Sequence, residues 1–190
     1  MNVIDEMNEI IGISKSQEFD IWTLVKYNYI KQPTTFFRRK IIDNLIGVNE
    51  DLHYIMDHEF WLRIGLSDFK LRYLPGLTYA NFRKCPGTKS YEYGSKFQKE
   101  FLIVVEQIIQ NPTFDYISQK EKKSLICEKK SLYLFSEFLI SLQNKEIIKS
   151  IKFLSNSIKT NRRILLEIGL WYRAILALQG KKFDWRKKYK

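Results

Sequence analysis

The hydrophobic period of the sequence changes near Tyr93, and this change constrains the fold more than any other feature. Before it, short strand-like and short helix-like patterns alternate, which is typical of an α/β layer arrangement. After it, apolar residues recur at helical spacing almost to the end of the chain. We therefore expect an α/β part over residues 1–90 and a basic, amphipathic helical region over residues 91–190.

The α/β part contains recognisable signals for starting and ending elements. Asp20 stands where it can cap a helix, Asp57 stands where it can cap a later helix that ends near Gly65, and Pro75-Gly76 is a turn signal. These signals predict strands at 10–13 and 34–37, helices from residue 21, at 38–45 and at 57–65, and a hairpin of 70–74 with 77–82.

The second half predicts four helices in succession. The first carries an apolar stripe that includes Phe97, Phe101 and Val105 and is ended by Asn111-Pro112. The other three are expected at 118–142, 145–159 and 162–178, before Gly180.

Charge is distributed unevenly along the chain, whose formal net charge is +11. Residues 1–95 hold 12 basic and 12 acidic residues, whereas residues 96–190 hold 20 and 9. The last thirty residues alone carry nine basic and two acidic residues. Such a basic balance points to nucleic acid, an anionic membrane surface or polyphosphate-like ligands, and does not choose among them.

Several other classes are disfavoured. Cys85 and Cys127 form no C-x-x-C pair, which speaks against a disulfide framework or a zinc finger and favours a reducing, cytoplasmic setting. The acidic start of the chain does not look like a secretory signal. The apolar stretch at 164–178 is shorter than the roughly 20 residues that a membrane span needs.

Four short motifs follow one another between residues 32 and 83. They are QPTTFFRR at 32–39, NEDLHY at 49–54, MDHEFWLR at 56–63 and ANFR at 80–83. In order and spacing they resemble the acceptor-side half of family 2 glycosyltransferases, which have the GT-A fold. The resemblance implies an inverting enzyme that transfers a sugar from a nucleotide-sugar donor to a hydroxyl acceptor, in polysaccharide or glycoconjugate biosynthesis.

The resemblance also implies roles for individual residues. Asp57 takes the place of the general base, which accepts the proton of the attacking hydroxyl. Glu59 is the second acidic member and orients the acceptor or the neighbouring backbone. The competing interpretation of Asp57, from the residues alone, is a helix cap without a catalytic role.

Further residues are expected around the substrates. Gln32 and Pro33 would face the sugar-binding cleft, although a turn without function is the alternative. Trp61 would stack on a sugar ring or, as its spacing from Ile64 favours, pack in the core. Basic residues of the following loop would bind the diphosphate or simply be solvated: Arg83, Lys84 and Lys89.

The expected cofactor is a divalent metal, Mg²⁺ or Mn²⁺, as in the family. Its ligands would lie mostly in an Asp-x-Asp stretch of the nucleotide-binding half, and no such stretch occurs in this sequence. Cys85 also stands where the family usually has histidine. The neighbours Asp57, His58 and Glu59 point in different directions on a helix and are not expected to share a metal ion.

The resemblance therefore covers only the acceptor side. Residues 1–13 look like the strand pair that follows the Asp-x-Asp. The chain would then be a fragment or split product that needs a partner chain for the donor-binding half, or it would have lost activity. Its incomplete sheet would leave an unpaired strand edge.

The last predicted helix and the tail KKFDWRKKYK combine aromatic and basic residues. This composition favours an anionic membrane surface, with RNA binding and a plain packed helix as the alternatives. Together with the resemblance, it predicts a peripheral protein at the inner face of the plasma membrane that acts on a sugar or lipid-linked acceptor. The alternative function is a non-catalytic basic helical module that binds membrane or nucleic acid.

Overall fold

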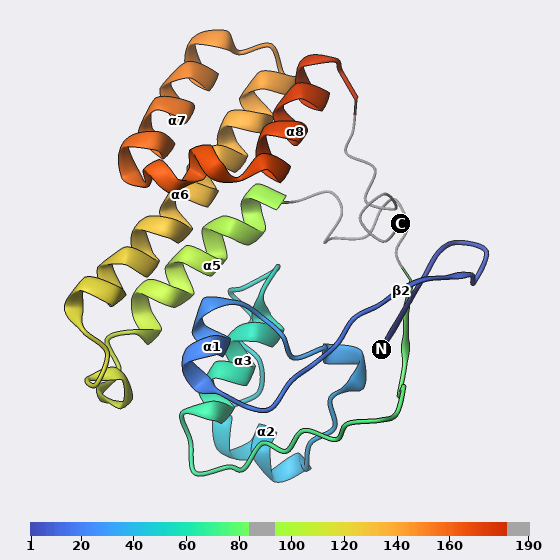
Figure 1. Ribbon diagram of the computed structural model, residues 1–190. Coiled ribbons are helices and arrows are strands. Elements are labelled where there is room, and N and C mark those ends of the chain that lie inside the picture. The colour runs from blue at the N-terminus through green and yellow to red at the C-terminus, as the bar shows by residue number, and fades with distance from the viewer. Residues whose placement is uncertain (84–93, 182–190) are drawn as a thin grey trace. The chain divides into compact units, whose positions relative to one another are not determined.

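The chain has a mixed α/β fold, as expected from the alternation of patterns in its first half (Figure 1). The computed structural model describes residues 1–83 and 94–181. Within these, one compact unit comprises residues 1–83 and 104–116, and the other comprises 94–103 and 117–181. Each unit is described separately below.

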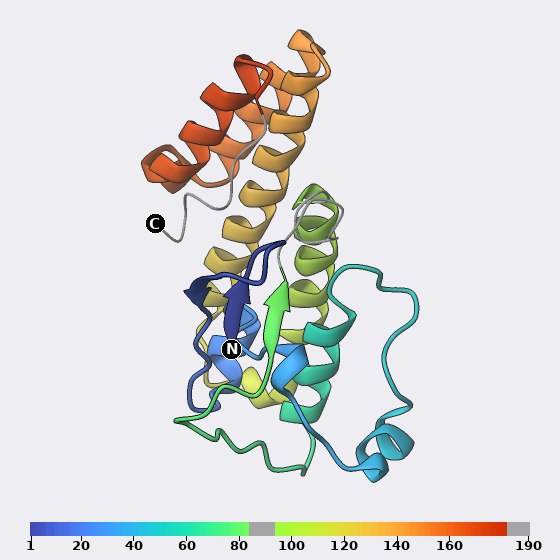
Figure 2. The ribbon, with the colours of Figure 1, turned by 90° about the vertical axis from the view of Figure 1, so that its right-hand side faces the viewer.

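The first unit contains a small mixed sheet with strand order β2-β1-β3. β1 (Asn2–Ile4) pairs antiparallel with β2 (Ile10–Ile13) and parallel with β3 (Asn81–Arg83), whose direction it shares in Figure 2. The predicted strand at 10–13 is confirmed. The side chains of Asn2 and Asn81 add a hydrogen bond of 3.1 Å beside the parallel ladder.

Three α-helices follow in this unit: α1 (Ile21–Lys26), α2 (Arg39–Leu45) and α3 (Met56–Gly65). The expected cap of α1 is confirmed, since the Thr23 backbone N–H donates to the Asp20 carboxylate at 2.6 Å. α2 ends as predicted: Ile46 takes a left-handed conformation, and Gly47 follows with φ +68°. α1 and α2 both contact α3.

α3 supplies much of the core of the first unit. Phe60, Leu62 and Ile64 are buried, as are Leu24 and Val25 of α1. The stretch 104–116 adds the end of α5 (Gly94–Ile108) and the 3-10 turn η2 (Pro112–Phe114), and further buried side chains come from it: Val104, Val105, Ile109 and Phe114.

The strand predicted at 34–37 is wrong. Gln32–Thr34 form instead a 3-10 turn, η1, with Pro33 inside it. The hydroxyls of Thr34 and Thr35 donate to the Lys31 carbonyl at 2.9 and 3.0 Å. Such local hydrogen bonds from side chains to the backbone compete with the hydrogen bonds of a strand ladder. The composition of the segment did not indicate them.

The hairpin predicted at 70–74 with 77–82 is also wrong. Only Asn81–Arg83 form a strand, and their partner is β1. Burial nonetheless alternates along residues 70–74, as in an extended chain. Gly76 has φ +92° after Pro75, as a tight turn requires. The turn predicted at Pro75-Gly76 is therefore confirmed, whereas the predicted pairing of the two flanking strands is wrong.

The prediction that Asp57 caps its helix fails by two residues. Ile55 occupies the cap position and makes no side-chain capping bond, and α3 begins at Met56. Asp57 therefore lies inside the first turn, where the exposed N–H groups of the helix end favour a negative charge.

The second unit is helical. It contains the start of α5 together with α6 (Gln119–Gln143), α7 (Ile147–Thr160), the 3-10 turn η3 (Arg162–Leu166) and α8 (Ile168–Leu178). The predicted helices at 118–142 and 145–159 are confirmed within two residues. Ser118 and Glu121 form a reciprocal capping box at the start of α6. The single helix predicted at 162–178 is wrong, because Glu167 leaves the helical conformation and separates η3 from α8.

The core of this unit lies among α6, α7, η3 and α8, which lie side by side in Figures 1 and 2. Phe135 contacts Phe138 and Trp171 through edge-on rings, with centroids 5.2 and 5.3 Å apart. Between α6 and α7, the hydroxyl of buried Ser131 donates to the Ser157 carbonyl, and that of Ser157 donates to the Ser131 carbonyl, at 2.9 and 2.8 Å. This exchange satisfies two buried hydroxyls and fixes the register of the helices.

Candidate functional site

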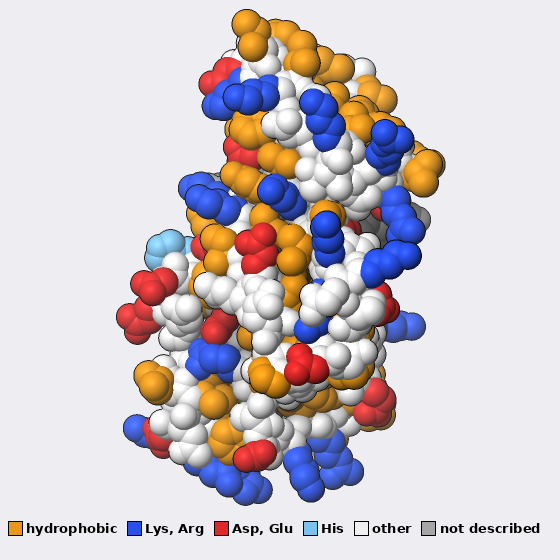
Figure 3. Space-filling model, turned by 90° about the vertical axis from the view of Figure 1, so that its left-hand side faces the viewer, with side chains coloured by type: hydrophobic (Ala, Val, Ile, Leu, Met, Phe, Trp, Pro, Cys, Tyr) orange, Lys and Arg blue, Asp and Glu red, His pale blue; other side chains and the backbone are white. Residues whose placement is uncertain are grey.

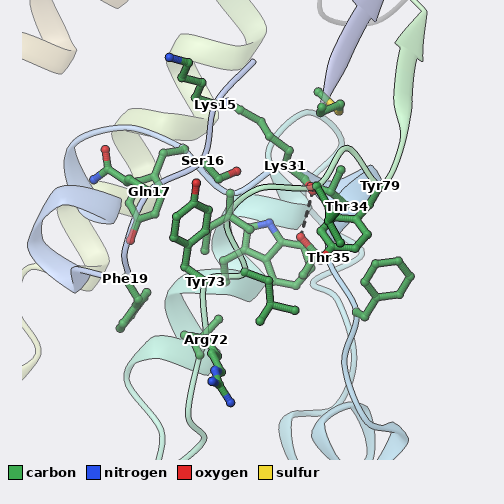
Figure 4. Close-up of a pocket in the computed structure, with 18 of the residues that line it drawn as sticks. Lys15, Ser16, Gln17, Phe19, Lys31, Thr34, Thr35, Arg72, Tyr73 and Tyr79 are labelled. Carbon is green, nitrogen blue, oxygen red and sulfur yellow. Dashed lines mark hydrogen bonds between the residues drawn. The ribbon is translucent and has the colours of Figure 1, made fainter. Parts of the chain in front are cut away.

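The first unit contains a cavity of about 600 Å³ (Figure 4). Its walls come from three loop segments, 13–19, 29–37 and 70–79, and from α3. The cavity is lined by aromatic rings, hydroxyl groups and basic side chains, a mixture that is typical of binding sites for polar small molecules. Of the predicted site residues that the structure describes, Trp61 lines the cavity.

Trp61 is both a core residue and part of the cavity wall, so the two interpretations of this residue do not exclude each other. Its side chain is 2% exposed, and its ring lies 5.5 Å from that of Phe60 and 6.0 Å from that of Phe37. Its indole Nε1–H is buried and has no acceptor within the described residues. An unsatisfied buried donor costs about 1–3 kcal/mol.

Asp57 lies one helical turn before Trp61, and residues four apart share a face of an α-helix. Burial raises the pKa of its carboxyl above the usual value of 3.8. Hydrogen bonds from the His58 N–H and the Asn28 side chain and the charge of Lys31 oppose this rise. Lys31 also lines the cavity, whereas Asp57 itself does not.

Glu59 is occupied by a neighbour on its own helix. The Arg63 guanidinium donates to both carboxylate oxygens, with Nε 2.7 Å from Oε1 and Nη2 3.0 Å from Oε2. Arg63 also donates to the carbonyls of Leu45 and Gly47, which follow α2. Of the two roles expected for Glu59, this arrangement fits orienting the backbone.

Gln32 and Pro33 are exposed in η1 and do not line the cavity. Their neighbours Lys31, Thr34 and Thr35 do line it. The Q-P pair therefore shapes the turn that places these three residues in the wall.

Arg83 contacts the turn between β1 and β2. Its guanidinium donates to the Asp5 and Glu6 carbonyls at 3.0 and 3.1 Å and to the Asn8 side chain at 2.6 Å. Lys84, Lys89 and Cys85 lie outside the described residues. In this structure Arg83 therefore serves to hold a loop of the sheet.

The acidic and histidine side chains on α3 do not fit a metal site with one another. His58 is buried, with Nε2 2.7 Å from the Leu24 carbonyl oxygen, and Glu59 is paired with Arg63. Across residues 1–83 and 94–181 no group of three His, Cys, Asp or Glu side chains is placed to hold a metal ion.

Several residues of the cavity wall were not singled out from the sequence. They include the basic residues Lys15, Lys70 and Arg72 and the aromatic residues Phe19, Tyr73 and Tyr79. The sequence contains no signal that separates these lysines from other surface lysines. The predicted hairpin also assigned this segment to a sheet, whereas in the structure residues between 70 and 79 line the cavity.

Comparisons with protein-family models, with curated proteins and with solved structures found no match to this chain. Within the described residues, no helix is long and apolar enough to cross a membrane.

Proposed function

We propose that the chain is the acceptor-side part of an inverting, nucleotide-sugar-dependent glycosyltransferase of the GT-A type, with Asp57 as its general base. The observation that carries the proposal is the position of Asp57. Its carboxylate sits in the first turn of α3, partly withdrawn from water and one turn from Trp61 in the cavity wall. A base needs a carboxylate that stays ionised near neutral pH yet accepts a proton readily.

The environment of Asp57 balances these two needs. Desolvation makes the carboxylate more basic, while the helix N-terminus, the Asn28 side chain and Lys31 keep its ionised form stable. In the proposed reaction, Asp57 takes the proton of the acceptor hydroxyl as that oxygen attacks the anomeric carbon. The nucleotide diphosphate leaves from the opposite face of the sugar.

The donor-binding half would pair with the first unit along its sheet. β2 is an edge strand of the described sheet, and Ile10 and Ile13 on it are exposed. An exposed apolar strand edge is a template for a further strand, from a partner chain or from another segment. The Mg²⁺ or Mn²⁺ ion of the family would belong to that half.

The direct test is transfer itself. In cells that produce the protein, the wild-type chain is replaced by Asp57→Asn, and transfer is measured from radiolabelled nucleotide sugars to acceptors in a membrane extract. We expect Asp57→Asn to abolish transfer and Asp68→Asn, which removes an exposed carboxylate, to leave it unchanged. Full transfer by Asp57→Asn, with the protein folded, would refute the proposal.

A second candidate function rests on α8 and η3. α8 packs on the core through Leu170, Trp171 and Ala174, yet Ile168, Ile175 and Leu178 are exposed. A helix that is apolar on both faces is normally buried. We therefore expect the exposed apolar face of α8 to bind a partner.

We propose that this partner is an anionic membrane surface at the cytoplasmic side. Arg162, Arg163 and Lys181 flank the exposed apolar side chains, and residues 161–190 carry nine basic against two acidic residues. Cations near anionic lipid contribute about 1 kcal/mol each. A membrane-bound helical unit fits both a lipid-linked acceptor and, without transferase activity, a basic membrane-binding module.

A further inference from the structure

Charge is segregated around the cavity of the first unit. Among the described residues, four basic side chains line it, Lys15, Lys31, Lys70 and Arg72, and no described Asp or Glu does. The described residues 1–83 nevertheless contain 11 acidic and 10 basic residues. Four of these ten basic residues line the cavity, whereas none of these eleven acidic residues does. This separation gives the cavity a positive field that favours anionic ligands.

The cationic groups are available for a ligand. Across the described residues, Lys15, Lys70 and Arg72 make no hydrogen bond, ion pair or ring contact. Figure 4 shows Lys15 and Arg72 on opposite sides of the cavity, with the ring of Tyr73 between them in this view. The charges are therefore spread along the lining rather than gathered at one point.

The rest of the lining suits a sugar ring. Phe36 and Tyr79 form an edge-on pair with ring centroids 6.2 Å apart, and both are exposed at the cavity. Aromatic faces bind the apolar faces of sugar rings, and hydroxyls such as those of Ser16 and Thr78 can bond to sugar hydroxyls. Trp61 adds a further aromatic ring to the cavity wall.

We infer that the cavity binds an acidic saccharide, a sugar that carries a carboxylate or phosphate group. This inference rests on the proposed function, in which such a saccharide is the acceptor. The negative groups pair with Lys15, Lys70 or Arg72, and the ring lies against the aromatic side chains. A neutral sugar lacks the first of these interactions.

Binding is measured with the 190-residue chain by isothermal titration calorimetry and by NMR of the Trp indole N–H signals, with Trp61 assigned from Trp61→Phe. The probes are methyl β-glucuronide, glucose 6-phosphate, neutral methyl β-glucoside and inorganic phosphate. We expect one or both acidic sugars to shift the Trp61 signal and to bind at least about tenfold more tightly than the glucoside, as one charge-assisted hydrogen bond provides. The uronate and sugar phosphate separate the two sources of charge.

The variant Lys70→Gln/Arg72→Gln should lose this tenfold preference and keep the weak binding of the neutral glucoside. Lys99→Gln/Lys120→Gln, which removes two basic residues of the second unit, is the control and should keep the preference. Equal binding of neutral and acidic sugars would overturn the inference, as would the absence of any binding. Phosphate that binds as well as glucose 6-phosphate would show an anion site without sugar recognition and would also overturn it.

The two proposals can fail separately. Asp57→Asn should still bind the acidic sugar, because Asp57 does not line the cavity. If acidic sugars bind but Asp57→Asn keeps full transfer, the proposed base is wrong and the ligand class stands. If transfer requires Asp57 but neutral sugars bind equally well, the ligand class is wrong and the proposed function stands.

Discussion

The Arg63 Nε atom lies 2.7 Å from the Glu59 Oε1 atom one turn earlier in α3. The same guanidinium donates to the carbonyls of Leu45 and Gly47 after α2. One ion pair thus holds the end of α2 against the helix that carries Asp57. The side chains of Arg63 and Glu59 are only 27% and 13% exposed. Those of the i, i+4 pair Arg39–Asp43 are 91% and 58% exposed.

Glu59→Gln should therefore lower the free energy of unfolding by about 1–2 kcal/mol, because Arg63 loses a charged acceptor in a partly buried place. Asp43→Asn is the matched control and should change it by less than about 0.5 kcal/mol, as is usual for exposed pairs. Equilibrium unfolding in urea measures both. Equal effects of the two substitutions would show that the Glu59 pair contributes no more than a surface pair.

Asp57 should make stability depend on pH. Burial raises the pKa of its carboxyl in the folded chain above the usual 3.8, so ionisation favours the unfolded chain. Its stabilising contribution is complete below pH 3.8 and is lost as the pH rises through the folded-state pKa. Asp57→Asn should therefore be more stable than the wild type at pH 7, and this advantage should vanish near pH 3.

Urea unfolding across this pH range tests the expectation, with Asp68→Asn as a control that removes an exposed carboxylate. A variant Asp57→Asn that is less stable than the wild type at pH 7 would show that the carboxylate stabilises the fold. In the same framework, the rate of sugar transfer should rise as Asp57 loses its proton.

The outer face of α8 should govern binding to membranes. Ile168→Asn/Leu178→Asn should reduce sedimentation with vesicles that contain phosphatidylserine at least about fivefold, because each exposed side chain would no longer enter the interface. The matched control is Ile148→Asn/Ile151→Asn on α7, where hydrophobic and basic side chains also reach the surface of the helical unit (Figure 3). These two residues are exposed too, and their replacement should have little effect.

Equal losses of vesicle binding for the two double variants would argue against a specific role of the outer face of α8. Salt-sensitive binding to RNA in place of vesicles would favour the nucleic-acid alternative.

The edge strand β2 should mediate association. Ile10→Lys places a charge on the exposed edge and should lower concentration-dependent self-association in light scattering, while the circular dichroism spectrum stays unchanged. Ile46→Lys, at an exposed position after α2 and away from any strand, is the control. If Ile46→Lys lowers association as much as Ile10→Lys does, the edge has no special role.

Local signals predicted the parts of the fold that depend on local chemistry. The Asp20 cap and the end of α2 at Gly47 each involve hydrogen bonds or backbone angles within a few residues. Hydrophobic period likewise predicted α6 and α7, since it reports which face of a helix is buried, but it did not predict the break at Glu167 between η3 and α8. The hairpin prediction was wrong because strand pairing is not local. The partner of Asn81–Arg83 is β1, which lies 79 residues earlier in the chain.

The residues of the candidate site also fall into two groups, those that short motifs predict and those that only the tertiary structure brings together. From the sequence alone came Asp57 as the proposed base, Glu59, Trp61 and the Gln32-Pro33 turn, because these residues belong to short motifs. Only the tertiary structure brought Lys15, Lys31 and Arg72 around one cavity, engaged Glu59 with Arg63 and left the Trp61 N–H without a described acceptor. The physical reason is that a motif specifies neighbours along the chain, whereas charge, burial and hydrogen bonding at a site arise from segments that meet only after folding.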